Sequence, residues 1–284
     1  METHNQYSIF GKDAWTILSD IELSIKTKVE SVGVPLKDWD VDIYRGVLTG
    51  YNDAFIISSE KRNEILDNCA DDEERERTSA IIRPILRGRD IARYTYNWAD
   101  LWLINTHNGI KGSLNRIHIE DYPAIKQHLD CYWDKIKPRA DQGDTPYNLR
   151  NCAYVDDFDK TKIVWIELSD ESKFAICDNY IPLNTVFFLT GSHLSHILGL
   201  LNSKLINWYF RDCIGTSSGA GTNRWLKYTV ELLPLLPYDL EIETLVNLRL
   251  TSDSDHVSLE LQIDKIVCKK YGLTEEEAEF ILEN

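Results

Sequence analysis

Short apolar runs set between longer helical repeats are the feature that most restricts the fold of this 284-residue chain. In residues 13–32 and 192–211, apolar side chains recur every three or four positions, as in amphipathic helices, and Ser192 is suited to cap the second. Five shorter runs favour β-strands: residues 54–57, 101–104, 163–168, 174–177 and 186–189. The pattern predicts an α+β fold with a mixed β-sheet and flanking amphipathic helices.

The remaining segments divide the chain into three parts. Residues 120–137 show a further helical pattern, which the following proline ends, and Thr274 with Glu277 forms a capping box before a last short helix. Residues 67–77 are densely charged and indicate a connector or an exposed helix, whereas the proline-rich residues 232–237 predict an extended strap that leaves the core. We therefore expect an N-terminal linking helix in residues 1–39, a main domain in residues 40–237 and an acidic helical tail in residues 238–284.

The net charge of the chain, −15, is the main argument against a nucleic-acid partner, because binding to phosphates normally needs an excess of Lys and Arg. The charge is unevenly distributed. Residues 239–284 hold twelve acidic and four basic side chains, so this tail carries −8 and residues 1–238 carry −7. A local basic surface is therefore compatible with the composition, although the chain by itself should bind DNA weakly.

Four arginines in one short segment are the strongest candidates for such a surface. Arg83, Arg87, Arg89 and Arg93 are interleaved with Ile, Leu and Gly. The guanidinium fork suits phosphate oxygens and the edge of guanine. The alternative is a strand-and-turn surface on which these arginines pair with the acidic residues at 71–76, and composition alone favours that alternative.

Two turn-like segments offer further polar groups. Thr49 and Asn52 flank a Gly-Tyr pair, and an Asn side chain matches the edge of adenine; the alternative is a purely structural turn before the next strand. Residues 215–221, rich in Gly and Ser and followed by Arg224, form either a loop that orders on DNA or a plain connector. They lack the Gly-Lys-Ser/Thr ending of a phosphate-binding P-loop.

Two patterns point weakly to metal ions. Glu171 and Lys173 match the end of a short signature of metal-dependent nucleases, but the same residues suit a solvated hairpin turn, which is the preferred interpretation. His193 and His196 are spaced to share a metal, yet no third ligand follows nearby, so surface or core histidines are favoured.

Targeting signals and cysteine usage indicate a cytoplasmic protein. The six cysteines show neither CxxC pairing nor zinc-ligand spacing, which favours reduced thiols. The first residues carry no signal-peptide pattern, and no run approaches the roughly 20 apolar residues of a membrane span. We expect no membrane partner, and no metal or cofactor site in this chain.

A series of motifs in a set order carries a family resemblance. The sequence resembles the TaqI-like C-terminal specificity domain of adenine-specific DNA methyltransferases and of fused restriction-modification enzymes. Each motif is short, but their order extends over most of the chain. The motifs are residues 39–42 (WDVD), 46–55 (GVLTGYNDAF), 84–91 (PILRGRDI), 139–143 (RADQG) leading to Tyr147, 162–165 (KIVW), 200–205 (LLNSKL), 233–237 (LPLLP), and 263–267 with 271–277 in the tail.

The resemblance implies a target-recognition domain that binds double-stranded DNA, mainly from the major-groove side, for an upstream methyltransferase domain or subunit. The chain contains neither a glycine-rich loop for S-adenosylmethionine nor the Asn/Asp-Pro-Pro-Tyr/Phe motif that holds an extruded adenine. Catalysis is therefore expected outside this chain, together with S-adenosylmethionine and, if a nuclease is fused, magnesium.

With this resemblance the arginine segment is interpreted as DNA-binding, and no residue is assigned to catalysis. The predicted DNA contacts are Arg45, Thr49, Asn52, Arg83, Arg87, Arg89, Arg93, Lys111, Arg139, Tyr147, Arg150 and Arg224. Two other classes stay open: a small metal-dependent nuclease that uses Glu171 and Lys173, and a protein-interaction module with an acidic tail.

Overall fold

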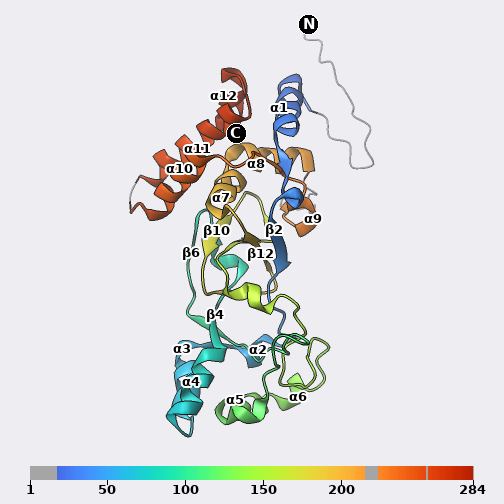
Figure 1. The fold of residues 1–284 in the computed structure, drawn as a ribbon, viewed down its shortest axis with the longest axis vertical. Coiled ribbons are helices and arrows are strands. Elements are labelled where there is room, and N and C mark those ends of the chain that lie inside the picture. Colours follow the sequence, from blue (N-terminus) through green and yellow to red (C-terminus); the bar gives the residue numbers. More distant parts are fainter. Residues whose placement is uncertain (1–17, 215–222, 254, 284) are drawn as a thin grey trace.

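A computed structural model describes residues 18–214, 223–253 and 255–283 and shows an elongated molecule (Figure 1). A four-stranded sheet lies near the middle. Helix α1 and the C-terminal helices α10–α12 lie at one end, and helices α2–α6 lie at the other. The helices are α1 (Asp20–Val32), α2 (Asn52–Phe55), α3 (Ser59–Asp67), α4 (Asp72–Ile81), α5 (Pro123–Asp130), α6 (Trp133–Ile136), α7 (Leu194–Asn202), α8 (Lys204–Tyr209), α9 (Lys227–Val230), α10 (Leu240–Thr251), α11 (His256–Lys270) and α12 (Glu275–Glu283).

The middle sheet is antiparallel and separates two hydrophobic cores. Its strand order is β10 (Phe174–Cys177), β8 (Lys162–Ile166), β12 (Val186–Gly191) and β2 (Val41–Arg45). Alternate residues of a strand point to opposite faces. Ile163 and Trp165 therefore belong to one core and Val164 to the other, and in β12 Phe187 and Phe188 are divided in the same way.

A second, mixed sheet lies on the side of helices α2–α6. Its order is β11 (Ile181–Pro182), β4 (Ile82–Leu86), β7 (Leu101–Ile104) and β3 (Ile56–Ser58), with β11 and β4 parallel and the other pairs antiparallel. Three two-stranded pairs complete the strands: β1 (Val34–Pro35) with β14 (Pro234–Leu235), β5 (Ile91–Ala92) with β6 (Thr95–Tyr96), and β9 (Leu168–Ser169) with β13 (Asn223–Arg224). The predicted α+β class with a mixed sheet is confirmed.

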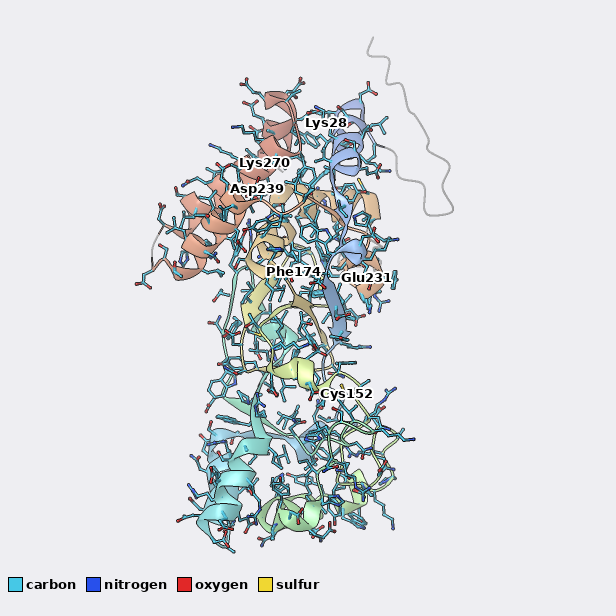
Figure 2. All side chains as sticks on the ribbon, viewed as in Figure 1. Lys28, Cys152, Phe174, Glu231, Asp239 and Lys270 are labelled. Carbon is cyan, nitrogen blue, oxygen red and sulfur yellow. The ribbon has the colours of Figure 1, made fainter. Side chains whose placement is uncertain are left out.

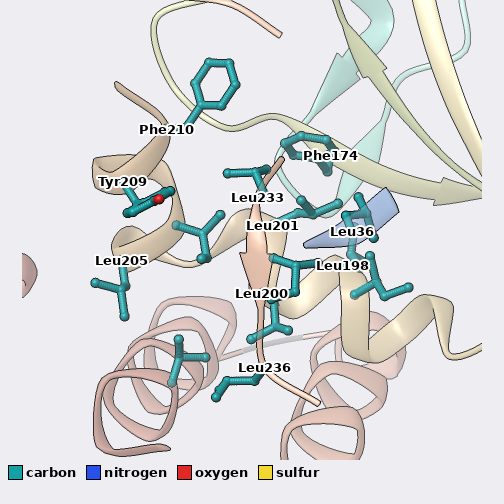
Figure 3. Close-up of a cluster of buried hydrophobic side chains, with 14 of the residues drawn as sticks. Leu36, Phe174, Leu198, Leu200, Leu201, Leu205, Tyr209, Phe210, Leu233 and Leu236 are labelled. Atoms are coloured by element: carbon teal, nitrogen blue, oxygen red, sulfur yellow. The ribbon is translucent and has the colours of Figure 1, made fainter. Parts of the chain in front are cut away.

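The flanking helices pack into the first of the two cores (Figure 3). Leucines of α7 and α8, among them Leu198, Leu201 and Leu205, lie beside Leu233 and Leu236 of the chain that follows α9. Ile25 of α1 and apolar residues of α10 and α11 belong to the same core. The helices at both ends of the chain are thus bound to the middle sheet by burial of apolar surface.

The prediction of a strand at residues 54–57 is wrong in its first half. Residues Asn52–Phe55 form the short helix α2, and β3 begins only at Ile56. A run of four apolar residues does not distinguish a buried helical turn from a strand. Here Ala54 and Phe55 are both fully buried, which the helical turn achieves because it places them against the second core.

The long helices predicted at 192–211 and 120–137 are each interrupted. Ser192 is not the cap of α7: His193 is, with a left-handed φ of 56°, while the Ser192 hydroxyl donates to Asp40. Ser203 ends α7 and accepts a hydrogen bond from the amide of Ile206, so it caps α8. The second pattern gives α5 and α6, which are separated at Cys131–Tyr132.

For the charged segment one of the two predicted alternatives is confirmed, whereas the prediction of an extended strap that leaves the core is wrong. The charged residues 67–77 are the end of α3 and most of α4, so the helical alternative applies. The proline-rich strap does not leave the core: Pro234 and Leu235 form β14, which pairs with β1, and both are buried. Part of the 13–32 helix and all of the 215–221 loop lie outside the described residues; α1 covers Asp20–Val32.

The predicted capping box at Thr274 and Glu277 is confirmed, and it also connects the two ends of the chain. The Thr274 amide donates to Glu277 Oε2 at 2.7 Å, and the Glu277 amide donates to the Thr274 hydroxyl at 3.3 Å. The same carboxylate accepts from Ser24 Oγ at 2.6 Å and from Lys28 Nζ at 2.5 Å on α1. Burial disfavours the charged form, but these donors outweigh it and lower the pKa of Glu277 to about 2.

We expect Glu277→Gln to lower the free energy of unfolding by about 1–2 kcal/mol at pH 7. A carboxyl whose pKa is lower in the folded state stabilises the fold above its unfolded pKa, which is roughly 4.3. That contribution is lost as the pH falls from there toward 2. Urea unfolding at several pH values should therefore show the two proteins converging in acid; a difference independent of pH would contradict this role.

The described part of the chain contains no helix that is both long enough and apolar enough to cross a membrane. All six cysteines are free thiols.

Candidate nucleic-acid interface

Three neighbouring hollows share lining residues. The Asn52 hollow, about 480 Å³, is lined by residues that include Asn52, Arg87 and Arg89. The Arg45 hollow, about 410 Å³, is lined by Arg45, Gly46, Val47, Leu48, Arg150, Asn151, Cys152, Ala153, Tyr154 and Asn184. The Lys111 hollow, about 880 Å³, is lined by Asn108, Asp144, residues 109–116 and residues 151–153.

Shared lining residues make these hollows a continuous row of neighbours along the surface, and we call the three together the interface groove. Asn184 lines both the Asn52 hollow and the Arg45 hollow. Residues 151–153 line both the Arg45 hollow and the Lys111 hollow. Figure 2 labels Cys152, which lies where the middle of the molecule meets the half that carries α2–α6.

The interface groove is basic although the chain is acidic. Its walls carry six cationic side chains and two carboxylates: Arg45, Arg87, Arg89, Lys111, Arg116 and Arg150, with Asp53 and Asp144. The chain as a whole carries −15. Local charge decides where a polyanion can lie, so the excess of cationic side chains on these walls suits one.

In the Asn52 hollow an amide and an unpaired guanidinium face the same space. Asn52 is the first residue of α2 and is exposed, and its Oδ1 accepts from the Thr49 hydroxyl at 2.6 Å. Arg89 is exposed on a 3₁₀ turn (Gly88–Asp90) and has no ion pair among the residues that the structure describes. Thr49 itself is only 2% exposed, so it orients Asn52 and does not reach the groove.

Arg139 lies beneath the groove and fixes its backbone. It is 6% exposed, and its guanidinium donates to the carbonyl oxygens of Thr49, Pro146 and Asn148. The guanidinium carbon lies 4.3 Å from the centroid of the Phe55 ring. Burial lowers the pKa of Arg139 to about 10. The structure thus gives this predicted DNA contact a positioning role: it joins the Thr49 turn to the loop that precedes Arg150.

Arg45 and Arg224 converge on one carboxylate. Arg45 is the last residue of β2; its Nη2 lies 3.4 Å from Glu167 Oε2, and its Nε donates to the Asn184 carbonyl at 2.7 Å. Arg224, on β13, places Nη2 at 2.8 Å from Glu167 Oε1. This hydrogen bond raises the pKa of Arg224. Both arginine side chains remain about half exposed, at 55% and 48%.

Three other groove arginines also have carboxylate partners. Arg87 bonds to both oxygens of Asp90, with Nη2 to Oδ1 at 2.7 Å, and this contact raises the pKa of Arg87. Arg150 Nη1 lies 3.3 Å from Asp141 Oδ1. Arg116 Nη1 lies 3.0 Å from Asp144 Oδ2, and hydrogen bonds from Asn108 and then from Arg116 lower the pKa of that carboxyl. Lys111 is exposed and has no ion pair among the described residues.

The structure does not bring Arg83, Arg93 and Tyr147 into the groove. Arg83 pairs with Asp159 at 2.6 Å. Arg93 lies under the C-terminal helices, where its guanidinium is 3.4 Å from Glu260 and 3.6 Å from Asp264 of α11. The Tyr147 hydroxyl donates to Asp130 at 2.5 Å on α5. These acidic residues, distant in the sequence, hold Arg93 in the packing of α11, so the geometry gives no support to its predicted DNA contact, which stays a prediction.

The four arginines of residues 83–93 therefore lie in different surroundings. Their ion-pair partners differ from the acidic residues that the sequence suggested. The residues that bind their guanidinium groups are not the acidic residues at 71–76 but Asp90, Asp159, Glu260 and Asp264. Only Arg87 and Arg89 of the four line the groove.

Several groove residues had no signal that we recognised in the sequence. Asn184, Thr185, Asn151 and Arg116 line the hollows. Asn184 lies in a turn between β11 and β12, where Asn is common for conformational reasons alone, so its residue type did not indicate a contact.

The two weak metal patterns find no support in the geometry. Lys173 Nζ lies 3.2 Å from Glu171 and 3.5 Å from Asp170, at an exposed turn. His196 is fully buried and bonds to the Leu236 carbonyl, and His193 lies against Tyr238. Among the residues described, no group of three or more His, Cys, Asp and Glu side chains could hold a metal ion.

Comparisons with known proteins agree with the resemblance noted in the sequence. The sequence profile of the TaqI-like C-terminal specificity domain matches residues 83–235. The structure is similar to that of the type IIL restriction-modification enzyme MmeI in complex with DNA, with a TM-score of 0.61, 13% identity, and coverage of 99% of this chain and 41% of that one. It is also similar to the type IIG restriction endonuclease BpuSI, with a TM-score of 0.52, 13% identity, and coverage of 88% and 32%.

At these identities the two structures establish a shared fold, and this chain spans less than half the length of either protein. The family profile is the stronger finding, because it covers more than half of the sequence. This chain belongs to the family of TaqI-like C-terminal specificity domains.

Proposed function

We propose that this chain recognises a specific sequence in double-stranded DNA, as the target-recognition part of a restriction-modification enzyme, and that the duplex lies along the interface groove. The observation that carries the proposal is the continuity of the three hollows, with six cationic side chains and two carboxylates on their walls. A phosphate backbone needs such a run of positive charge, and the groove supplies it on a chain whose total charge is negative.

Different residues are suited to contact the DNA phosphates and the DNA bases. Lys111 and Arg150, both exposed at the rim, are suited to phosphates, which set the position of the duplex. Asn52 and Arg89 share one hollow and have the donors and acceptors that read adenine and guanine in the major groove. Asn52 is held by Thr49, so its amide is already oriented.

Catalysis belongs, in this proposal, to other parts of the parent protein. A methyltransferase domain or subunit with bound S-adenosylmethionine would modify an adenine, and a fused endonuclease would use magnesium. The similarity to a type IIL restriction-modification enzyme and to a type IIG restriction endonuclease supports an assembly of this kind. Such an enzyme would act in the cytoplasm.

Binding of the full chain to labelled random-sequence duplex DNA, measured by fluorescence anisotropy at several salt concentrations, tests the proposal. We expect weak binding at low salt, with a slope of log K against log salt of about −3 to −5, because several phosphates are neutralised. No binding at low salt, or an affinity that does not change with salt, would contradict the proposal and favour the acidic interaction module.

A further inference from the structure

Glu167 is placed between Arg45, which lines the interface groove, and Arg224, which lines none of the three hollows but binds the same carboxylate. Its two carboxylate oxygens lie 3.4 Å from Arg45 and 2.8 Å from Arg224. The glutamate side chain is 17% exposed, whereas both arginine side chains are about half exposed. One recessed carboxylate therefore partly neutralises two guanidinium groups that solvent can reach.

The backbone holds this carboxylate in a fixed position. The Glu167 amide donates to the Thr185 carbonyl at 3.3 Å, and the Glu167 carbonyl accepts from the Trp225 amide at 2.8 Å. Thr185 lines the Asn52 hollow, and Arg45 lines the next hollow and bonds to Asn184. Glu167 itself lines none of the hollows, but it is bonded to residues that line two of them, Thr185 and Arg45.

The arrangement is repeated along the groove. Arg87, Arg116 and Arg150 each have an aspartate partner within 3.3 Å. The pairs of Arg116 and Arg150 are exposed and therefore weak, so a phosphate that is well placed can displace the carboxylate. A phosphate that is poorly placed gains little, because it only replaces one anion by another. Asp90 is buried and holds Arg87 more firmly.

We propose that Glu167 competes with DNA phosphates for Arg45 and Arg224, and so lowers the affinity of the groove for non-specific DNA. The inference rests on the proposed function, since it assigns a regulator to the same groove. The two arginines then bind phosphate only when the rest of the duplex is seated, which makes Glu167 a determinant of specificity rather than of binding strength.

The variant Glu167→Gln tests this on the full chain with random-sequence duplex. We expect about three- to tenfold tighter binding at low salt, because two weak ion pairs no longer compete. The slope of log K against log salt should steepen by about 1–2, since up to two more phosphates are neutralised. Glu231→Gln is the matched control: it removes the same charge nearby, but Glu231 pairs with Lys227 and not with a groove arginine.

A second variant gives the same answer if Glu167→Gln does not fold. The triple change Arg45→Gln, Arg224→Gln and Glu167→Gln, which removes both arginines together with their competitor, should weaken non-specific binding by less than about twofold, because the three side chains together carry a net charge of only about +1. A loss of tenfold or more, or a Glu167→Gln protein that binds like Glu231→Gln, would overturn the inference while leaving the groove as the DNA site. If neither the wild type nor any variant binds duplex, the proposed function fails as well.

Discussion

Replacing Arg139 by Met is expected to lower the free energy of unfolding by about 3–4 kcal/mol, the largest effect that we foresee for a single change near the groove. The guanidinium donates to three backbone carbonyl oxygens, two of them in the loop 146–148 and one at Thr49. Methionine fills similar volume but leaves these buried acceptors without donors, and each unsatisfied group costs roughly 1–3 kcal/mol.

Arg139→Lys distinguishes the positive charge of this side chain from the geometry of its guanidinium fork. Lysine keeps the positive charge, but its three N–H donors all lie on one nitrogen, so it cannot reach the three separate carbonyl groups that the planar arginine fork spans. We expect it to recover less than half of the lost stability in urea unfolding. Full recovery by Lys would mean that charge, and not the geometry of the fork, holds the Thr49 turn and the loop together.

Arg89→Ala is expected to weaken binding to the preferred DNA sequence by about 5- to 150-fold, while binding to random duplex changes by less than about threefold. Arg89 is exposed in the Asn52 hollow without an ion pair among the described residues, so its donors are free to read a base edge. The loss should be concentrated at one base pair, because a bidentate contact discriminates a single guanine.

The measurement has two steps. The preferred sequence is first selected from a random pool by the full chain or its parent enzyme, and affinities are then compared by anisotropy for the wild type and Arg89→Ala. Arg75→Ala is the control, since Arg75 is an exposed arginine on α4 that lines none of the three hollows. An equal loss on all sequences would make Arg89 a phosphate contact instead of a base contact.

The sequence predicted an element correctly where the pattern of apolar residues within the element itself matches the side chains that the fold buries. Residues 101–104 and 174–177 are strands as predicted, because apolar residues bounded by turns have few other places to pack. The Thr274 cap was also predictable, since both partners lie within one helical turn. By contrast, residues 52–55 form a helix whose stability comes from burial of Ala54 and Phe55, and no local pattern contains that information.

The residue types of the candidate site were predictable from the sequence, but the side chains and backbone groups that each residue contacts were not. Arg45, Asn52, Arg87, Arg89, Lys111 and Arg150 were predicted as DNA contacts and do line one groove. That they bind DNA stays a prediction. Arg93 and Arg139 look the same in the sequence, yet tertiary packing places one against α11 and the other beneath the Thr49 turn. Such partners are distant along the chain, so spacing cannot reveal them.

The path of the chain through the middle sheet has a consequence for how new specificities can arise. The chain leaves the sheet at the end of β2 and re-enters it at β8, and both strands pair with β12. Both strands are antiparallel to β12 and therefore run in the same direction, so Arg45 at the end of β2 lies level with Trp165, three residues beyond the start of β8 at Lys162. The two points are about 14 Å apart, two strand spacings across the sheet and three residues along it. The intervening residues 46–161 carry Asn52, Arg89 and Lys111, and they also supply β4, which pairs with β11, and Arg93, which α11 holds. An exchange of this excursion between homologues therefore transfers these groove residues together, and it keeps the fold only where the partners of β4 and Arg93 are exchanged with it.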